Sequence, residues 1–361
     1  MIFSVIKEEW RAVWRDEGVV LIAVFALFIY GISYSLGYGG EVLNDVPIAV
    51  VVGDESALSR RLVKMFNASQ QLHVAHEVAD MNEAEQLLRE RKVWGVVALS
   101  PTLERDILAQ RQGRVAILGD ASYFLAYREV VEGAVATIQQ MNAEIVKGRE
   151  GTYNSPIIYE QRNLFNPSLG YGIFVMPAII LLIVQQTALI GVGMVSATRR
   201  EQGLRYGSSS PLVITIGRTT TYLVIYTLTL GFMLTVHYWL FDYPMRGAWW
   251  RCVAVILPYM LSVIFLAQML GVLFRRRESS IVWLLWLSIP FLLVSGVSLP
   301  SEFFPSWLYW LGRVVPSSSA VEAWIAVQTM GATLADIAPK LIMLWILVVV
   351  YGAGAVVANR K

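Results

Sequence analysis

At 361 residues, the chain is 56% hydrophobic and only 16% charged, with a mean hydropathy of +0.55. This composition excludes an ordinary soluble domain and indicates several membrane-spanning helices. The formal net charge is only +2 and the basic residues form no continuous stripe, which argues against a nucleic-acid partner. The single cysteine, Cys252, excludes an intrachain disulfide and a cysteine-based metal cluster.

Residues 1–17 predict an amphipathic helix along the cytosolic membrane surface. Lys7, Arg11 and Arg15 recur at four-residue spacing, opposite apolar residues that include two tryptophans. Indole rings favour headgroup depth and basic side chains favour anionic lipid, so membrane lipid is an expected partner of this helix. Segment 18–38 is long enough to cross a bilayer and shows no convincing signal-peptide cleavage site. We expect it to be an uncleaved first span that starts in the cytosol.

Residues 39–168 carry no segment that is long and apolar enough to span a bilayer. Strands are predicted at 46–52, 72–78, 93–99 and 115–118, and helices at 56–66, 81–92, 102–111 and 127–146. Alternating strands and helices indicate an inserted α/β domain with a mainly parallel sheet. Because the preceding span leaves the cytosol, we expect this domain to be extracytoplasmic.

Two features of this domain were candidates for a cofactor or metal site. The first predicted strand is followed by G-D-E-S at 53–56, which lacks the G-x-G-x-x-G spacing of a dinucleotide site. His73 and His76 are three residues apart in a strand, so they are expected to face opposite sides of the sheet without a third ligand. We therefore predict neither a cofactor nor a metal here, and we assign the domain to recognition of cargo or of a partner.

The second predicted span, 173–197, carries Gln185, Gln186 and Thr187 near its middle. Amides that face lipid are costly, so these side chains are expected to face other helices or a polar path. Hydrogen bonds between helices are the favoured interpretation, and direct contact with cargo along a translocation path is the alternative. Pro290, which interrupts the fifth predicted span, is the other candidate for that path.

The region 169–361 is expected to hold spans two to six. The later spans are predicted at 212–240, 253–274, 281–299 and 341–358. Segment 298–316 is rich in proline and aromatic residues, which is typical of an interfacial or re-entrant helix, here at the outer face. The predicted fold is an α-helical integral membrane protein of about six spans, with an N-terminal interfacial helix and the inserted α/β domain.

Two basic loops predict the orientation of the chain. Loop 198–211 carries Arg199, Arg200 and Arg205, and three arginines stand at 275–277. Basic residues in short loops remain on the cytosolic side, so both loops and both termini are expected in the cytosol. The chain contains no G-x-x-x-x-G-K-[S/T] motif for nucleotide phosphates, so active transport would need an ATPase partner.

Three segments carry a family resemblance. Residues 46–62 (V-P-I-A-V-V-V-G-D-E-S-A-L-S-R-R-L) are similar to a strand-turn-helix opening, and R-R-E-Q-G-L at 199–204, followed by Pro211, looks like an R-E-x-G-T loop. Residues 295–316 are similar to a segment rich in proline and aromatic residues after a fifth span. Over nearly its whole length the chain resembles the ABC-2 type permeases, the membrane subunits of type V ABC exporters. The resemblance is to the bacterial subgroup with a large external domain between the first two spans.

This resemblance implies a non-catalytic permease subunit of the bacterial inner membrane that moves a lipid, drug, polysaccharide or peptide outward. ATP and Mg²⁺ would be held by two cytosolic ATPase subunits, and a second permease, the same or a related chain, would complete the transporter. A periplasmic adaptor is a further partner left open.

The resemblance also implies roles for two cytosolic segments. Helix 1–17 would be the connecting helix, and loop 198–211 would be the coupling loop that docks on the ATPase. The implied docking residues are Arg199, Arg200, Glu201, Gln202, Gly203 and Arg205. Leu204 and Arg205 stand after Gly203 where the family usually has threonine and an acidic residue.

A second hypothesis is a membrane-anchored receptor or assembly factor whose outer domain binds a partner protein. The polar content of the second span and the elaborate segment 298–316 exceed what an anchor needs. A membrane enzyme acting on lipid has less support, because Glu302 and Glu322 lack a convincing nucleophile or metal partner in the sequence.

Overall fold

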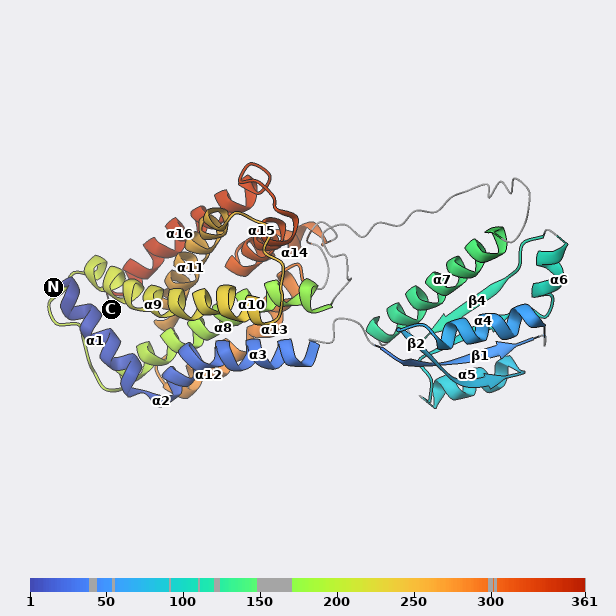
Figure 1. Cartoon of the computed structure of the whole chain (residues 1–361). Helices are drawn as coiled ribbons and strands as arrows, with labels where there is room; N and C mark the ends of the chain where they lie inside the picture. Colours follow the sequence, from blue (N-terminus) through green and yellow to red (C-terminus); the bar gives the residue numbers. More distant parts are fainter. Residues whose placement is uncertain are drawn as a thin grey trace. The chain divides into compact units, whose positions relative to one another are not determined.

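The computed structural model describes residues 1–38, 44–53, 56–90, 92–109, 111–119, 124–147, 171–297, 301 and 304–360. The chain forms two compact units (Figure 1). The membrane unit comprises Met1–Gly39 and Leu164–Lys361, and the inserted unit comprises Gly40–Asn163.

The inserted unit contains a four-stranded sheet with the strand order β2-β1-β3-β4. The strands are β1 (Val46–Val52), β2 (Leu72–Val78), β3 (Gly95–Leu99) and β4 (Val115–Gly119). β1 runs parallel to both β2 and β3, as the alternating pattern predicts. β4 is antiparallel to β3, so the sheet is mixed at this edge. A single antiparallel edge strand is a common addition to a parallel sheet.

Helices cover both faces of this sheet. They are α4 (Ala57–Asn67), α5 (Met81–Arg89), α6 (Leu103–Leu108) and α7 (Phe124–Lys147). Figure 1 shows α4 and α7 on one face and α5 on the other. Ile48 and Val50 of β1 pack with Phe66 and Val130 on the first face, whereas Ala49 belongs to the core under α5. α4 is capped by Ser56, whose Oγ accepts a hydrogen bond from the Ser59 backbone N–H at 3.1 Å.

A bulge in β2 corrects the prediction for the two histidines. The register pairs His73 with Pro47 and His76 with Ala49, and Ala75 is the extra residue between them. Pro47 and Ala49 lie on the same face of β1, so the bulge places both histidines on one face. The prediction of opposite faces is therefore wrong, because the sequence carries no sign of the bulge. In the described ranges, no third His, Cys, Asp or Glu joins them in a group that could hold a metal.

Gly95 allows close packing of the sheet against α7. A Cβ at this position would lie 2.4 Å from Cγ1 and 2.8 Å from Cγ2 of Val130. A β-branched side chain in a helix has one preferred rotamer and cannot turn away cheaply. We expect Gly95→Ala to destabilise the inserted unit by about 1–3 kcal/mol. Faster amide hydrogen exchange in β3 of the full-length variant would show this loss, and unchanged protection would contradict it.

Among the described residues of the membrane unit, six helical segments are long and apolar enough to cross a membrane. They are Glu17–Gly37, Val175–Glu201, Pro211–Leu240, Trp249–Gly271, Arg277–Val294 and Ala338–Ala358. All six correspond to predicted spans, with boundaries that differ by several residues. The chain is therefore a mostly helical, multi-pass membrane protein.

Individual helices build these spans. The first is α2 (Glu17–Val20), the π-helix η1 (Leu21–Phe25) and α3 (Ala26–Tyr38), and the second is α8 (Tyr171–Glu201). The third is α9 (Pro211–Phe232), the π-helix η2 (Met233–His237) and α10 (Tyr238–Leu240), followed by α11 (Trp249–Gly271). The last two are α12 (Arg277–Trp286) with α13 (Ser288–Val294), and α16 (Ala338–Ala358). α8 lies at the centre, where it packs against α3, α11 and α12.

The break in the fifth span falls at Leu287, just before the predicted position. Pro290 lies in the first turn of α13. Proline lacks the N–H that would bond back to the carbonyl of residue 286, so the helix ends before it and restarts.

Two further helices follow the fifth span. α14 (Ser306–Arg313) falls inside the predicted interfacial segment and exposes Trp307 and Trp310. Residues 298–300 and 302–303 of that segment, including Glu302, lie outside the described residues. α15 (Pro316–Met330) is not among the predicted elements, although proline at its start and Gly331, with φ 70°, just after its end are ordinary helix boundary signals. The wholly buried Trp324 fixes α15 in the core.

Candidate functional site

The N-terminal helix α1 (Ile2–Arg15) presents three different faces. Val5, Glu9 and Val13, each four residues apart, are buried against the other helices of the membrane unit. A second face exposes Phe3, Trp10 and Trp14 and also carries Lys7. The third face carries Glu8, Arg11 and Arg15. Within each set, successive residues are three or four positions apart, as on one side of a helix. Arg11 and Arg15 line the cavity described below together with Glu8, whereas Lys7 does not.

Glu9 attaches α1 to the third span through a buried ion pair. Its Oε1 lies 3.0 Å from Nε of Arg218 in α9, and both side chains are at most 5% exposed. The Tyr206 hydroxyl donates a hydrogen bond to the other carboxylate oxygen. Burial alone raises the pKa of Glu9, but the charge of Arg218 and the hydrogen bonds from Tyr206 and Arg218 outweigh it, so this pKa lies below its ordinary value.

Arg218 also joins three other helices to this ion pair. Its Nη1 donates to Oδ1 of Asn359, just after α16, at 3.1 Å, and its Nη2 donates to Oγ of Ser196 in α8 at 2.6 Å. Asn359 in turn donates to Oε1 of Gln268 in α11 at 3.0 Å. The guanidinium is thus paired and hydrogen-bonded, which a buried charge requires. These contacts join α1, α8, α9, α11 and the end of α16 into one connected structure.

The predicted loop 198–211 begins later than expected, because residues 198–201 form the last turn of α8. Two arginines and Glu201 in this turn attach segment 198–211 to its surroundings. Arg199 pairs with Glu8 at 3.3 Å and lies over the Tyr206 ring, 3.6 Å from its centroid. Arg200 donates to the backbone carbonyls of Val272 and Phe274, beyond the end of α11. Glu201 accepts a hydrogen bond from the backbone N–H of Arg277 at 3.1 Å. The loop is therefore attached to α1 and to the segment that leads into α12.

The remaining predicted docking residues have different surroundings in the same loop. They are Gln202, Gly203 and Arg205. Gly203 has φ 65° and ends α8, in the left-handed conformation that glycine adopts most easily. Arg205 is exposed. Gln202 and Arg205 line a cavity of about 900 Å³ that Arg200 and Glu201 do not line. Arg200 and Arg205 both line a smaller cavity of about 290 Å³. Of the six predicted docking residues, the structure thus places Arg199, Gln202 and Arg205 on one hollow surface.

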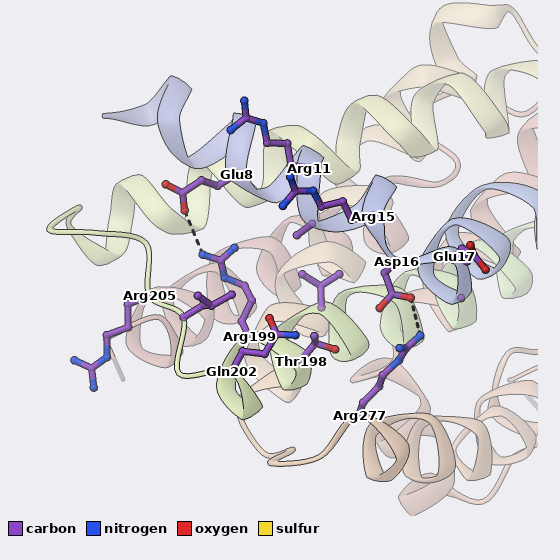
Figure 2. Close-up of a pocket in the computed structure, with 14 residues that line it drawn as sticks. Glu8, Arg11, Arg15, Asp16, Glu17, Thr198, Arg199, Gln202, Arg205 and Arg277 are labelled. Atoms are coloured by element: carbon purple, nitrogen blue, oxygen red, sulfur yellow. Dashed lines mark hydrogen bonds and ion pairs between the residues drawn. The ribbon is translucent and has the colours of Figure 1, made fainter.

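The cationic cavity lies between α1, loop 198–211 and the start of α12, and has a volume of about 900 Å³ (Figure 2). It is lined by Glu8, Arg11, Ala12, Arg15, Asp16, Glu17, Gly18, Val195, Thr198, Arg199, Gln202, Leu204, Arg205 and Arg277. Figure 2 shows the two ion pairs within it, Arg199 with Glu8 and Arg277 with Asp16. The Arg277–Asp16 distance is 2.6 Å.

Three of the four predicted path residues line a second, mainly apolar cavity. It has a volume of about 650 Å³ and is lined by α3, α8, α12 and α13 with part of η1. Gln185, Gln186 and Thr187 all line it, whereas Pro290 is exposed and its neighbours Ile289 and Phe291 line the cavity instead.

These three polar side chains also bond to other helices. Gln185 Oε1 accepts from the backbone N–H of Ser317 in α15 at 2.9 Å. Gln186 Nε2 donates to the carbonyl of Leu284 in α12. Thr187 Oγ1 accepts from the Tyr226 hydroxyl at 3.3 Å and donates to Ile183 O in its own helix. The favoured interpretation, hydrogen bonds between helices, agrees with these contacts.

We expect Gln185→Met to destabilise the membrane unit by about 1–3 kcal/mol. The substitution keeps the side-chain volume but leaves the buried Ser317 N–H without an acceptor, in the first turn of α15 where no intrahelical acceptor exists. Gln186→Met is the matched control, since it removes one ordinary hydrogen bond worth about 1 kcal/mol. Denaturant unfolding in detergent micelles measures the loss of stability in each variant. Equal losses in the two variants would contradict the larger cost expected at Gln185.

Four residues that hold this site together were not among the residues predicted from the sequence. They are Glu9, Tyr206, Arg218 and Asn359. A signal for two of them was present. Glu9 interrupts the apolar positions Val5 and Val13, and Arg218 is a charge inside a span. A charge in either position has to find a partner, so the two could have been paired.

The comparisons with known proteins agree with this architecture. The profile of the family described as ABC-2 family transporter protein matches residues 18–357. The probable multidrug ABC transporter permease YbhR of Escherichia coli K12 is 23% identical over 320 residues, covering 87% of this chain and 86% of that protein. The inner membrane transport permease YhhJ of the same strain is 21% identical over 351 residues, covering 95% and 92%. The chain therefore belongs to the ABC-2 family of transporters, as a permease subunit that implies an ATPase partner.

Proposed function

We propose that this permease subunit belongs to an ATP-driven exporter that moves its substrate outward across the bacterial inner membrane. The cationic cavity is the observation that carries the proposal, because it unites the coupling loop and α1 in one hollow surface. Tyr206 of this loop donates to Glu9 of α1, and Glu9 pairs with Arg218 of α9, which supports a role in transmitting force, since a loosely held loop would move without the spans.

The residues of this chain indicate which functions belong to it and which belong to its ATPase partner. It lacks a phosphate-binding loop, so ATP and Mg²⁺ are held by cytosolic ATPase subunits and this chain is non-catalytic. Both termini and the cationic cavity lie in the cytosol, where the ATPase docks. In this orientation the inserted unit is extracytoplasmic, and it recognises cargo or a periplasmic adaptor.

Transport requires a second permease, either another copy or a related chain. The path for the substrate runs along α8, α12 and α13, where the 650 Å³ cavity is lined mainly by apolar side chains. An apolar lining favours a substrate with apolar parts, such as a lipid or a hydrophobic drug, over a polysaccharide or a hydrophilic peptide. The name of the relative YbhR, a probable multidrug ABC transporter permease, supports the same preference.

Co-purification from mild detergent tests this function. The full-length chain is expected to recover an ATPase, and ATP hydrolysis by the complex is expected to drive outward movement of a fluorescent lipid or a hydrophobic dye in vesicles. Recovery of a partner without any ATPase, together with no ATP-dependent movement, would favour the membrane-anchored receptor and overturn the proposal. Protease accessibility of the inserted unit in spheroplasts tests the orientation separately.

A further inference from the structure

We propose that a groove between the third and fourth spans holds one acyl chain of a phospholipid, whose phosphate group binds Arg246. The groove is a mainly apolar cavity of about 510 Å³. One wall is formed by α9 with η2 and the other by α11, and Met245 and Trp324 complete the lining. It shares no lining residue with the cationic cavity or with the cavity at Gln185.

The groove is about as deep as one leaflet of a bilayer. Its first wall extends from Leu223 to Thr235 and its second from Trp249 to Met260. At about 1.5 Å per helical residue, each wall is about 16–18 Å long, and one leaflet of the hydrocarbon core is about 15 Å thick. Trp249 is 77% exposed in the first turn of α11, where an indole favours the membrane interface. The groove therefore runs from one interface to the middle of the bilayer, as a single acyl chain does.

Gly231 keeps the interfacial half of the groove open. It lines the groove, and a Cβ at this position would have no other atom within 4 Å. The Thr235 hydroxyl, on the same wall, donates to the Gly231 carbonyl at 2.7 Å and so is satisfied within its own helix. Hydrocarbon can fill this space without leaving that hydroxyl unpaired.

Arg246 supplies the cation for the headgroup. It follows Met245, which lines the groove, and its side chain is exposed. Its backbone N–H donates to the Gln328 carbonyl at 2.9 Å, which fixes its position against α15. Among the described residues, no ion pair joins Arg246 to Asp242 of the same turn or to another acid. A guanidinium complements a phosphate, so a cation beside an apolar groove favours a phospholipid over an uncharged lipid.

Photocrosslinking of the full-length chain in detergent tests the inference. The probes are a phosphatidylcholine with a photoreactive group on one acyl chain and a diacylglycerol with the same group, each a small fraction of the micelle. Mass spectrometry of peptides locates the label. Gly231→Leu fills the groove. Gly37→Leu is the matched control, because Gly37 is also an exposed glycine in a spanning helix, with open space around its Cβ position.

Phosphatidylcholine is expected to label the groove peptide that carries Cys252 and Ile256 more strongly than the exposed face of α16. Gly231→Leu should reduce the groove label at least about tenfold, whereas Gly37→Leu should change it less than about twofold, since excluding two methylene groups from burial already corresponds to about tenfold. Arg246→Gln should reduce labelling by phosphatidylcholine about fivefold and leave labelling by diacylglycerol unchanged.

Equal labelling of the groove and of α16 residues such as Ile346 and Val349 would indicate annular lipid only and overturn the inference. An equal loss in Gly231→Leu and Gly37→Leu would overturn the binding site, and an equal effect of Arg246→Gln on both probes would overturn the phosphate contact. Arg246 is exposed, so its variant is expected to fold, and equal elution of all the proteins on size exclusion checks this. Each of these outcomes leaves the proposed transport function standing.

Discussion

Replacing Arg218 with methionine is expected to lower the free energy of unfolding by about 3–5 kcal/mol. The substitution leaves the Glu9 carboxylate buried without its cation, and it also removes the donors to Asn359 and Ser196. An isolated buried charge is costly because neither water nor an opposite charge solvates it. Denaturant unfolding in detergent, followed by tryptophan fluorescence, measures the loss.

Two further variants are compared with Arg218→Met for their loss of stability. In the double variant Glu9→Leu with Arg218→Met both charges are gone, so it is expected to be more stable than Arg218→Met alone. Glu8→Gln removes the neighbouring pair with Arg199, in which the Glu8 side chain is 45% exposed, and should cost only about 0–1 kcal/mol. If Arg218→Met cost no more than Glu8→Gln, the buried pair would not anchor α1.

The same pair determines the pH dependence. In the native protein the pKa of Glu9 lies below its ordinary value, which is about 4.3 for an unfolded chain. The stability contributed by the ion pair is therefore complete above about pH 4.3 and is lost as the pH falls through the lower native pKa. Without Arg218, burial instead raises the pKa of Glu9, so the gap between wild type and Arg218→Met should shrink on acidification.

The spans could be predicted because hydropathy and length are local properties. Ala338–Ala358 is apolar throughout, and its start lies within three residues of the predicted one. α15 could not be found this way, because it has 15 residues and begins with Pro-Ser-Ser-Ser, too short and too polar for a span. Its burial depends on neighbours such as Gln185, which supplies the acceptor for Ser317. Contacts of that kind arise only in the folded bundle.

Some details of the sheet could not be predicted from the sequence for a similar reason. The strand positions follow from apolar runs such as 46–52, but the direction of β4 and the bulge at Ala75 depend on pairing between distant segments. The candidate site likewise has features that the sequence predicts and features that depend on tertiary contacts. Charge alone indicated loop 198–211, yet only tertiary contacts show that Arg205 lines the cavity while Arg200 points to the end of α11.

That difference between Arg200 and Arg205 predicts two separable defects in one loop. Arg200 bonds to the carbonyls of Val272 and Phe274, and Glu201 accepts from the Arg277 N–H, so both tie α8 to the segment between α11 and α12. Neither lines the cationic cavity. Arg200→Leu is therefore expected to leave the amount of bound ATPase unchanged, whereas Arg205→Leu reduces it.

Arg200→Leu is expected instead to weaken the coupling between the loop and the spans. Changes within a coupling network alter it by about 0.5–2 kcal/mol, so stimulation of ATP hydrolysis by the permease should fall by a factor of about 2 to 30. Arg200→Lys should restore only part of it, because a flexible lysine ammonium is less preorganised than the planar guanidinium, whose Nη1 donates to both carbonyls. ATP turnover per bound ATPase, measured in nanodiscs, separates this defect from lost docking. Loss of bound ATPase in Arg200→Leu equal to that in Arg205→Leu would instead make Arg200 a docking residue, and the loop would then bind its partner along its whole length.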